Sequence, residues 1–355
     1  MPQSSRSDPI RRGPSSHSRP AVGPRGPAVV ALGGGHGLSA TLRALRTLTD
    51  DVTAIVGVAD DGGSSGRLRH ELGVPPPGDL RMALAALCGD DAWGRTWSQV
   101  MQHRFGGNGE LAGHATGNLL IAALWEETGN IVEGLEWVAA LLGANGRVLP
   151  VATIPLDIVA DVKGIDPTKP DEVVQVTGQV SIESSRGRVI SFRVEPVDPP
   201  ACPQAVLAII EADAIVLGPG SWYTSVLTHL MVPGVREALA AATADKYLVL
   251  NLDGKHLSAD GILESTQDFS SASYLWIWKN NFPEVDLDYV LADPAYVDDV
   301  EHLRQACESV GAELVLDRIV TTNPIQNWSK SAESPRHSAH LLAAALGTLL
   351  SRGTI

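Results

Sequence analysis

The sequence predicts an α/β fold with a doubly wound, mostly parallel sheet, and three observations lead to this prediction. A short apolar run at 28–32 is followed by glycines within 33–37 and by a helical pattern with leucines at 38, 42, 45 and 48. A second apolar run at 52–59 completes a strand–helix–strand unit, whose strands pair in parallel. A third run at 214–217 leads into another glycine-rich turn and another helix. These units predict a Rossmann-like sheet with ligand-binding turns at the carboxyl ends of its strands.

The remaining elements follow in order and are separated by proline, glycine and helix-capping signals. Between 147 and 195 the pattern becomes β, with a hairpin-like turn at 184–187, so we expect a β-rich insertion that contributes no site residue. The aromatic-rich segment 260–286 is expected to be irregular and to serve packing. Helices are expected over 80–88, 91–103, 119–128, 131–142, 204–212, 297–309 and 340–350, and further strands over 247–251, 289–292 and 314–316.

Composition limits the class of protein. The chain has 355 residues and a formal net charge of −14, which argues against nucleic acid as the main partner. Residues 1–26 are rich in Ser, Pro, Arg and Gly and are expected to be a disordered tail, leaving 27–355 as a single domain. No apolar run approaches the roughly 20 residues that a membrane span needs. Cys88, Cys202 and Cys307 are far apart and show no zinc or disulfide spacing, which favours a reducing cytoplasm.

Two adjacent carboxylates, Asp60 and Asp61, follow the apolar run at 52–59. Like charges at one strand end destabilise the fold unless a cation or hydrogen-bond donors offset them, so a divalent metal such as Mg²⁺ is one candidate ligand. The glycines that follow allow backbone N–H groups to converge on an anion. Ser64 or Ser65 is expected to cap the short helix that follows. The stretch therefore favours a ligand site over a plain turn.

Polar residues also gather at two later helix starts. Asp79 is a candidate N-cap, for which a structural and a functional role are equally supported. Arg81 lies in the first turn of the same helix, where the helix dipole disfavours a cation, and this conflict suggests an anionic partner. His114 and Asn118 stand beside another helix start, a natural place for phosphate or sugar hydroxyls, although a lone histidine is more often structural.

The glycines at 33–37 do not fit the dinucleotide-binding fingerprint, because Leu38 occupies the place of its third glycine. Asp60 could still bind a ribose hydroxyl, as in dinucleotide-binding folds. The phosphate-loop pattern is absent, since no Gly-Lys-Ser/Thr follows. An NAD-dependent oxidoreductase is therefore the weakest of the alternatives.

Eight motifs occur in order between Ala28 and about Leu250: ALGGGHGL, VADDGGSSGRLR, PPPGDLRMALAAL, QHRFGG, GHATGN, GRVLP, LGPGSWYTS and MVPG. In them the chain resembles the YvcK-type gluconeogenesis factors, relatives of the CofD-like 2-phospho-L-lactate transferases. The form with His36 among the glycines resembles the actinobacterial branch. The resemblance implies a CofD-like fold and a cytoplasmic bacterial protein that binds UDP-sugars such as UDP-N-acetylglucosamine. It also implies a role in cell shape and peptidoglycan synthesis during gluconeogenic growth, and a link to Ser/Thr protein kinases. We further expect a homo-oligomer.

The resemblance assigns site residues one by one, and it also shows two departures. Arg336-His337 stands where the family has an Arg-His-Asp-Thr segment, but Ser338 and Ala339 follow here, so the threonine that is a phosphorylation candidate in relatives is absent. After Leu252 the usual Pro-Gly-Glu-Thr element is replaced, and most of 253–330 follows the family loosely. The ligand-binding residues implied are Gly33, Gly34, Gly35, Gly37, Asp60, Asp61, Ser64, Ser65, Asp79, His114, Asn118, Gly218, Gly220, Ser221, Thr224 and Arg336.

Two function hypotheses of different classes remain. The first is a non-catalytic UDP-sugar sensor, since no nucleophile–base–orienter arrangement is recognisable in the sequence. The second is a transferase of the phospholactate type, in which Asp60 and Asp61 would hold a divalent ion that stabilises the transferring phosphoryl group.

Overall fold

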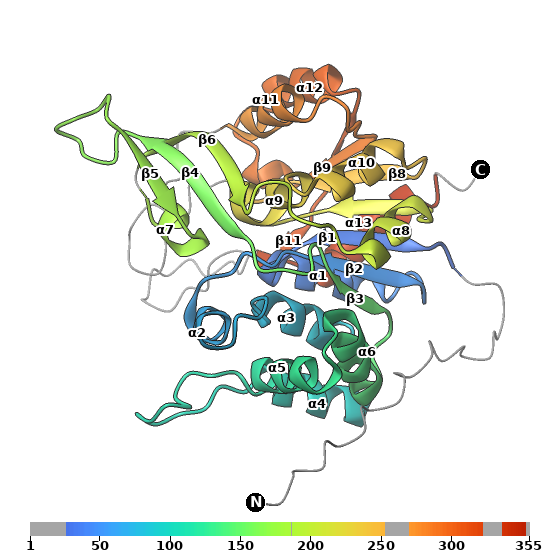
Figure 1. Ribbon diagram of the computed structural model, residues 1–355. Helices are drawn as coiled ribbons and strands as arrows, with labels where there is room; N and C mark the ends of the chain where they lie inside the picture. The colour runs from blue at the N-terminus through green and yellow to red at the C-terminus, as the bar shows by residue number, and fades with distance from the viewer. Residues whose placement is uncertain (1–25, 186, 253–269, 322–335, 353–355) are drawn as a thin grey trace, which may run out of the picture.

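A computed structural model of the chain describes residues 26–185, 187–252, 270–321 and 336–352 (Figure 1). At its centre lies a seven-stranded sheet in the order β10-β9-β8-β7-β1-β2-β3, with every neighbouring pair parallel. The predicted doubly wound parallel sheet is confirmed. Its strands are β1 (Val29–Gly33), β2 (Val52–Val56), β3 (Arg147–Pro150), β7 (Ala214–Leu217), β8 (Asp245–Val249), β9 (Tyr289–Ala292) and β10 (Glu313–Leu316).

The order of the strands reverses between β1 and β7. From β1 the chain proceeds outward through β2 to β3, and from β7 it proceeds in the opposite direction through β8 to β10. Every residue of β1, β2 and β7 is buried, which explains why these strands appear in the sequence as continuous apolar runs. Leu32 pairs with Leu217, so the two glycine turns that follow these strands begin side by side. Open α/β sheets bind ligands at such a reversal.

Helices cover the sheet and extend beyond its two ends. In Figure 1, α3 to α6 form a group beside β2 and β3, and α11 and α12 lie side by side. Helix α12 also contacts β10. The helices are α1 (Gly35–Leu45), α2 (Gly63–Leu72), α3 (Gly78–Ala86), α4 (Ala92–Gln102), α5 (Thr116–Thr128), α6 (Ile131–Leu142), α8 (Pro203–Ile210), α9 (Leu227–Leu230), α10 (Pro233–Ala241), α11 (Ser271–Asn281), α12 (Val300–Ser309) and α13 (Ala339–Leu350), with a π-helical turn η1 (Trp222–Val226) and a 3-10 turn η2 (Pro294–Tyr296).

The insertion differs in extent from the expectation. Its first predicted strand, β3, is the edge strand of the central sheet, so the separate antiparallel sheet begins later. That sheet has the order β5-β4-β6, with β4 (Asp157–Lys163), β5 (Val173–Thr177) and β6 (Arg188–Glu195). Residues predicted to continue β5 instead form the short helix α7 (Gln179–Glu183), which Gly178 precedes with a φ of 95°. Figure 1 shows that the antiparallel sheet and α7 project from the central sheet.

The prediction of an irregular segment at 260–286 was wrong for 271–281, which form α11. The expected packing role is correct for Trp278, whose ring is buried and whose Nε1 donates to the carbonyl of Val285 at 2.8 Å. A two-stranded ribbon of β11 (Val320–Thr321) and β12 (Arg336–His337) then precedes α13.

Residues 1–25 of the expected tail at 1–26, residues 253–269 of the loosely matching region 253–330, and residues 322–335 lie outside the described residues. Across the parts of the chain that are described, no helix is long and apolar enough to cross a membrane.

Candidate ligand site at the ends of β1 and β7

The first glycine turn (33–37) connects β1 to α1 and contacts the second. Gly34 is the N-cap of α1, and Gly35 has a φ of 58°, a region that favours glycine. A Cβ on Gly37 would overlap the carbonyl oxygen of Pro219, so the two turns touch through their backbones. The absence of side chains here brings backbone N–H groups and the start of α1 close together, which is the arrangement that binds phosphate.

The second glycine turn (218–220) follows β7. The carbonyl of Gly218 accepts a hydrogen bond from Thr41 Oγ1 on α1 at 3.1 Å, which ties this turn to the first. Ser221 is the N-cap of η1, although its side chain makes no capping hydrogen bond. Thr224 is buried within η1, and its hydroxyl donates to the Glu183 carboxylate on α7. The structure therefore brings together both predicted turns and a residue of the insertion.

Asp60 and Asp61 point to different neighbours. Asp60 Oδ1 accepts from the N–H of Gly62 at 2.9 Å, and its other oxygen faces Gly78 at the start of α3. Asp61 Oδ1 accepts from the N–H of Val180 on α7 at 3.0 Å. Backbone N–H donors thus offset both negative charges. From the sequence, a cation or hydrogen-bond donors were the two expected ways to do this. The expectation that the insertion contributes nothing to the site was wrong.

The residues present do not fit a metal held by the protein. The two carboxylates diverge, and within the described ranges no group of three His, Cys, Asp or Glu residues is arranged to hold an ion. Mg²⁺ binding usually draws on one or two carboxylates together with substrate phosphates. Asp60 and Asp61 therefore do not form a preformed metal site in the folded chain.

Ser64 and Ser65 do not cap α2, contrary to the prediction. The helix begins at Gly63, with Gly62 as its N-cap and no side-chain capping bond, and both serines are buried in its first turn. Ser65 Oγ lies against Gly78. Ser64 instead joins α2 to α5.

Ser64, His114 and Asn118 form a buried hydrogen-bonded network. Ser64 Oγ accepts from Asn118 Nδ2 at 3.0 Å and from the N–H of Ala115 at 3.3 Å. Its single proton is therefore left to donate to His114 Nδ1, 3.0 Å away. Burial lowers the pKa of His114, which agrees with a neutral ring accepting at Nδ1. These three predicted residues meet, and their mutual bonds show a structural role beside the site.

Asp79 is not the N-cap of α3, as had been expected, because Pro77 occupies that position. Its carboxyl lies behind the first glycine turn, against Gly34, where the backbone of Gly35 donates to it. Burial, followed by the negative charges of Asp60 and Glu183, raises the pKa of Asp79 to about 7, while the Gly35 hydrogen bond and Arg81 oppose this rise. Asp79 can therefore exchange a proton near neutral pH.

Arg81 is the most informative residue that the resemblance did not assign. Its side chain is 4% exposed, and burial together with the charge of Arg104 lowers its pKa to about 10. Asp79 and Asp60 favour its charged form, yet its Nε and Nη1 atoms have no hydrogen-bond partner among the residues described. A Cβ on Gly117 of α5 would lie 2.7 Å from Arg81 Cγ, so this glycine makes room for the arginine. The dipole conflict at the start of α3 was the sequence signal for this residue.

Further positive charge surrounds the start of α1. Partial burial, Arg336 and Arg81 lower the pKa of His36, which places both guanidinium groups near this exposed ring. Arg336, on β12, therefore contributes positive charge near the start of α1, and its role in ligand binding stays a prediction. His337 is held differently, since its Nε2 lies 3.2 Å from the carbonyl oxygen of Leu250 and burial lowers its pKa to about 4.

The site therefore combines basic and acidic groups around the first glycine turn. Arg81, Arg336 and backbone N–H groups suit a phosphate or diphosphate. Asp60 and Glu183 suit the hydroxyl groups of a sugar, because carboxylates accept hydrogen bonds. Glu183 lies in a segment that gave no sequence signal for this site, and Arg104 lies in the QHRFGG motif but was not assigned to the site.

Comparison with known proteins identifies the family. The family model for 2-phospho-L-lactate transferase CofD matches residues 29–326. A putative gluconeogenesis factor of Mycobacterium leprae is 51% identical over 291 residues, covering 81% of this chain and 79% of that protein. The gluconeogenesis factor of Bacillus subtilis is 33% identical over 334 residues, covering 91% and 98%.

A solved structure supports the same assignment. The crystal structure of a UPF0052 family member from Bacillus halodurans superposes with a TM-score of 0.77 at 32% identity, covering 91% of this chain and 99% of that one. With parallel sheet, glycine turns and motifs in agreement, the chain belongs to the CofD-like family of gluconeogenesis factors.

Proposed function

We propose that the protein is a regulatory protein that binds a nucleoside diphosphate sugar, UDP-N-acetylglucosamine, at the ends of β1 and β7. The observation that carries this proposal is Arg81, a buried guanidinium with two donors left without partners beside a glycine turn. A buried cation without a hydrogen-bonded counter-charge costs stability, so its presence is best accounted for by an anionic ligand. The diphosphate would lie against the two glycine turns and Arg81, close to Asp79 behind the first turn, and the sugar hydroxyls would face Asp60 and Glu183.

The proposal includes a biological setting. Bound UDP-N-acetylglucosamine would report the supply of a cell-wall precursor, and the liganded protein would act on cell shape and peptidoglycan synthesis in the cytoplasm during gluconeogenic growth. Ser/Thr protein kinases and cell-wall synthesis proteins are its proposed partners, and a homo-oligomer its proposed state. These parts rest on the family resemblance.

The test compares Arg81→Met with Arg43→Met by isothermal titration with UDP-N-acetylglucosamine, with and without Mg²⁺. Arg43 is an exposed arginine in the last turn of α1 and gives the same change of charge away from the turns. We expect Arg81→Met to weaken binding at least a hundredfold, while its thermal stability is unchanged or higher because an unpaired buried cation has been removed. Normal binding by Arg81→Met would contradict the proposed site, and no binding by the unchanged protein would contradict the ligand.

A second candidate function is transfer of a phosphoryl-linked group, as the family name of CofD suggests. One observation favours it: Asp79, with a pKa near 7, can take a proton from an attacking hydroxyl. Incubation with a phospholactate–nucleotide donor and a deazaflavin acceptor, followed by mass spectrometry, tests this. Product that disappears in Asp79→Asn would make the protein a transferase, whereas UDP-sugar binding without product supports the sensor.

A further inference from the structure

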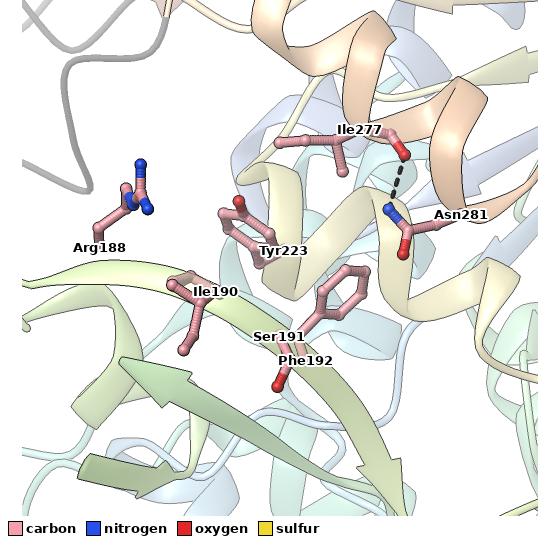
Figure 2. Close-up of a pocket in the computed structure, with 8 residues that line it drawn as sticks. Arg188, Ile190, Ser191, Phe192, Tyr223, Ile277 and Asn281 are labelled. Atoms are coloured by element: carbon pink, nitrogen blue, oxygen red, sulfur yellow. Dashed lines mark hydrogen bonds between the residues drawn. The ribbon is translucent and has the colours of Figure 1, made fainter. Parts of the chain in front are cut away.

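A cavity of about 420 Å³ lies between the insertion and α11, apart from the glycine turns. Its apolar lining includes Phe192 of β6, Tyr223 of η1 and Ile277 of α11 (Figure 2). The rings of Phe192 and Tyr223 meet edge to face, with centroids 5.2 Å apart. Its volume falls within the range of about 300–1,000 Å³ that is usual for small-molecule sites. We refer to it as the β6–α11 cavity.

The strand that forms one wall is irregular where it borders the cavity. Asp161 of β4 pairs with Ser191, and the next residue, Val162, pairs with Val189, so Ile190 has no partner in the ladder. This β-bulge reverses the alternation of side chains along β6, and residues on both sides of it, Arg188 and Phe192, line the cavity. Ile190 is 46% exposed, although it is a large apolar side chain. Bulges of this kind are common beside functional sites because they redirect a side chain.

Polar groups stand at one side of this apolar surface. In Figure 2 the guanidinium of Arg188 and the hydroxyl of Tyr223 lie on the same side of the cavity. Burial raises the pKa of Tyr223 to about 12, and the charge of Arg188 opposes the rise, so the two groups interact and the phenol stays protonated. Arg188 is exposed and forms no ion pair with another residue in the described segments. The cavity thus offers a cation and a hydroxyl donor beside aromatic and aliphatic side chains.

We propose that the β6–α11 cavity is a second ligand site, which binds a small aromatic anion. The ring of the ligand packs on Phe192, Tyr223 and Ile277, and its carboxylate, sulfonate or phosphate pairs with Arg188. The cavity is linked to the nucleotide site through η1, because Tyr223 lines the cavity and the next residue, Thr224, donates to Glu183. The aromatic anion binds in this cavity whether or not a UDP-sugar occupies the glycine turns.

The experiment uses 1-naphthyl phosphate and its uncharged counterpart 1-naphthol, each titrated against protein carrying the fluorescent anion 1-anilinonaphthalene-8-sulfonate. We expect 1-naphthyl phosphate to displace the dye and 1-naphthol to bind at least tenfold more weakly. Arg188→Ala should weaken 1-naphthyl phosphate at least tenfold and leave 1-naphthol unchanged. Arg193→Ala is the matched control, since Arg193 lies on the same strand and pairs with Glu195 at 3.0 Å.

Three outcomes would overturn the proposal: equal affinity for the two naphthyl compounds, an unchanged Arg188→Ala, or an equal loss in Arg193→Ala. The variant Arg81→Met separates this proposal from the preceding one. It should retain the displacement by 1-naphthyl phosphate, whereas loss of displacement would place the aromatic anion in the nucleotide site and overturn the second site. Failure of UDP-N-acetylglucosamine to bind would leave this result unaffected.

Discussion

The two glycine turns resemble each other in sequence but not in their surroundings. The first opens an eleven-residue helix, α1, and is backed by a carboxyl group, Asp79. The second opens a π-helical turn, and Ser225 lies behind Gly220. The same strand–glycine–helix pattern therefore produces one turn whose electrostatics depend on a titrating acid and one whose neighbour is a neutral hydroxyl. Local sequence determines the backbone path, while residues from elsewhere decide the chemistry.

The largest effect is expected where the turns touch. A Cβ in Gly37→Ala would overlap the Pro219 carbonyl, and backbone cannot move aside as a flexible side chain can. We expect the free energy of unfolding to fall by about 3 kcal/mol or more. In Gly35→Ala the space is open and only the φ of 58° opposes the substitution, which costs about 1–2 kcal/mol. Urea denaturation measures both. Equal losses in the two variants would mean that the turns do not meet as described.

The acid behind the first turn should make stability depend on pH. Because the pKa of Asp79 is raised from 3.8 to about 7 by folding, the folded protein holds a proton between pH 4 and 7 that the unfolded chain has lost. The free energy of unfolding contributed by this group therefore decreases as pH rises through that range. As pH rises from 4 to 7, the free energy of unfolding of Asp79→Asn should therefore increase relative to that of the unchanged protein.

The same carboxyl should affect binding of an anion. Above pH 7 the ionised Asp79 repels the proposed diphosphate, so affinity should fall by up to about tenfold per pH unit, the limit for one linked proton. In Asp79→Asn this decrease should disappear. A pH series of titrations from 6 to 8.5 measures it, and the same slope in both proteins would show that Asp79 is not near the ligand.

The smallest effect on stability is expected at the second turn. A Cβ in Gly220→Ala would lie 3.0 Å from Ser225 Cβ, which a small shift relieves, so unfolding should change by less than about 1 kcal/mol. If the backbone of this turn holds the diphosphate, affinity for UDP-N-acetylglucosamine should still fall about tenfold, or 1.4 kcal/mol.

Gly234→Ala on α10 is the control for this substitution, because its Cβ would also lie 3.0 Å from a neighbouring Cβ, that of Ala201. It should leave affinity unchanged. An equal loss of binding in the two variants would remove the second turn from the site.

Most of the fold could be predicted from the sequence. The errors occur where one residue pattern is compatible with two kinds of secondary structure. The strands at 214–217 and 289–292 were predicted to the residue, since buried parallel strands are continuous apolar runs. The helix at 271–281 was missed because the apolar residues at 274–278 surround it on all sides and hide its buried face of Ala272, Leu275 and Trp278. Helix α7 was predicted as part of a strand. The predicted N-caps at Ser64 and Asp79 were wrong because Gly62 and Pro77 are the N-cap residues of α2 and α3.

The sequence alone determined the parallel sheet, the glycine turns and the polar residues near strand ends, because these depend on local backbone preferences and on continuous burial. Tertiary structure decided which charges meet. Burial shifts the pKa of Asp79 and of His36 most, and charges from distant segments, among them Arg81, Glu183 and Arg336, add to or oppose these shifts. Burial and neighbouring charge are properties of the folded chain, so the chemistry of this site could not be predicted from the order of its residues.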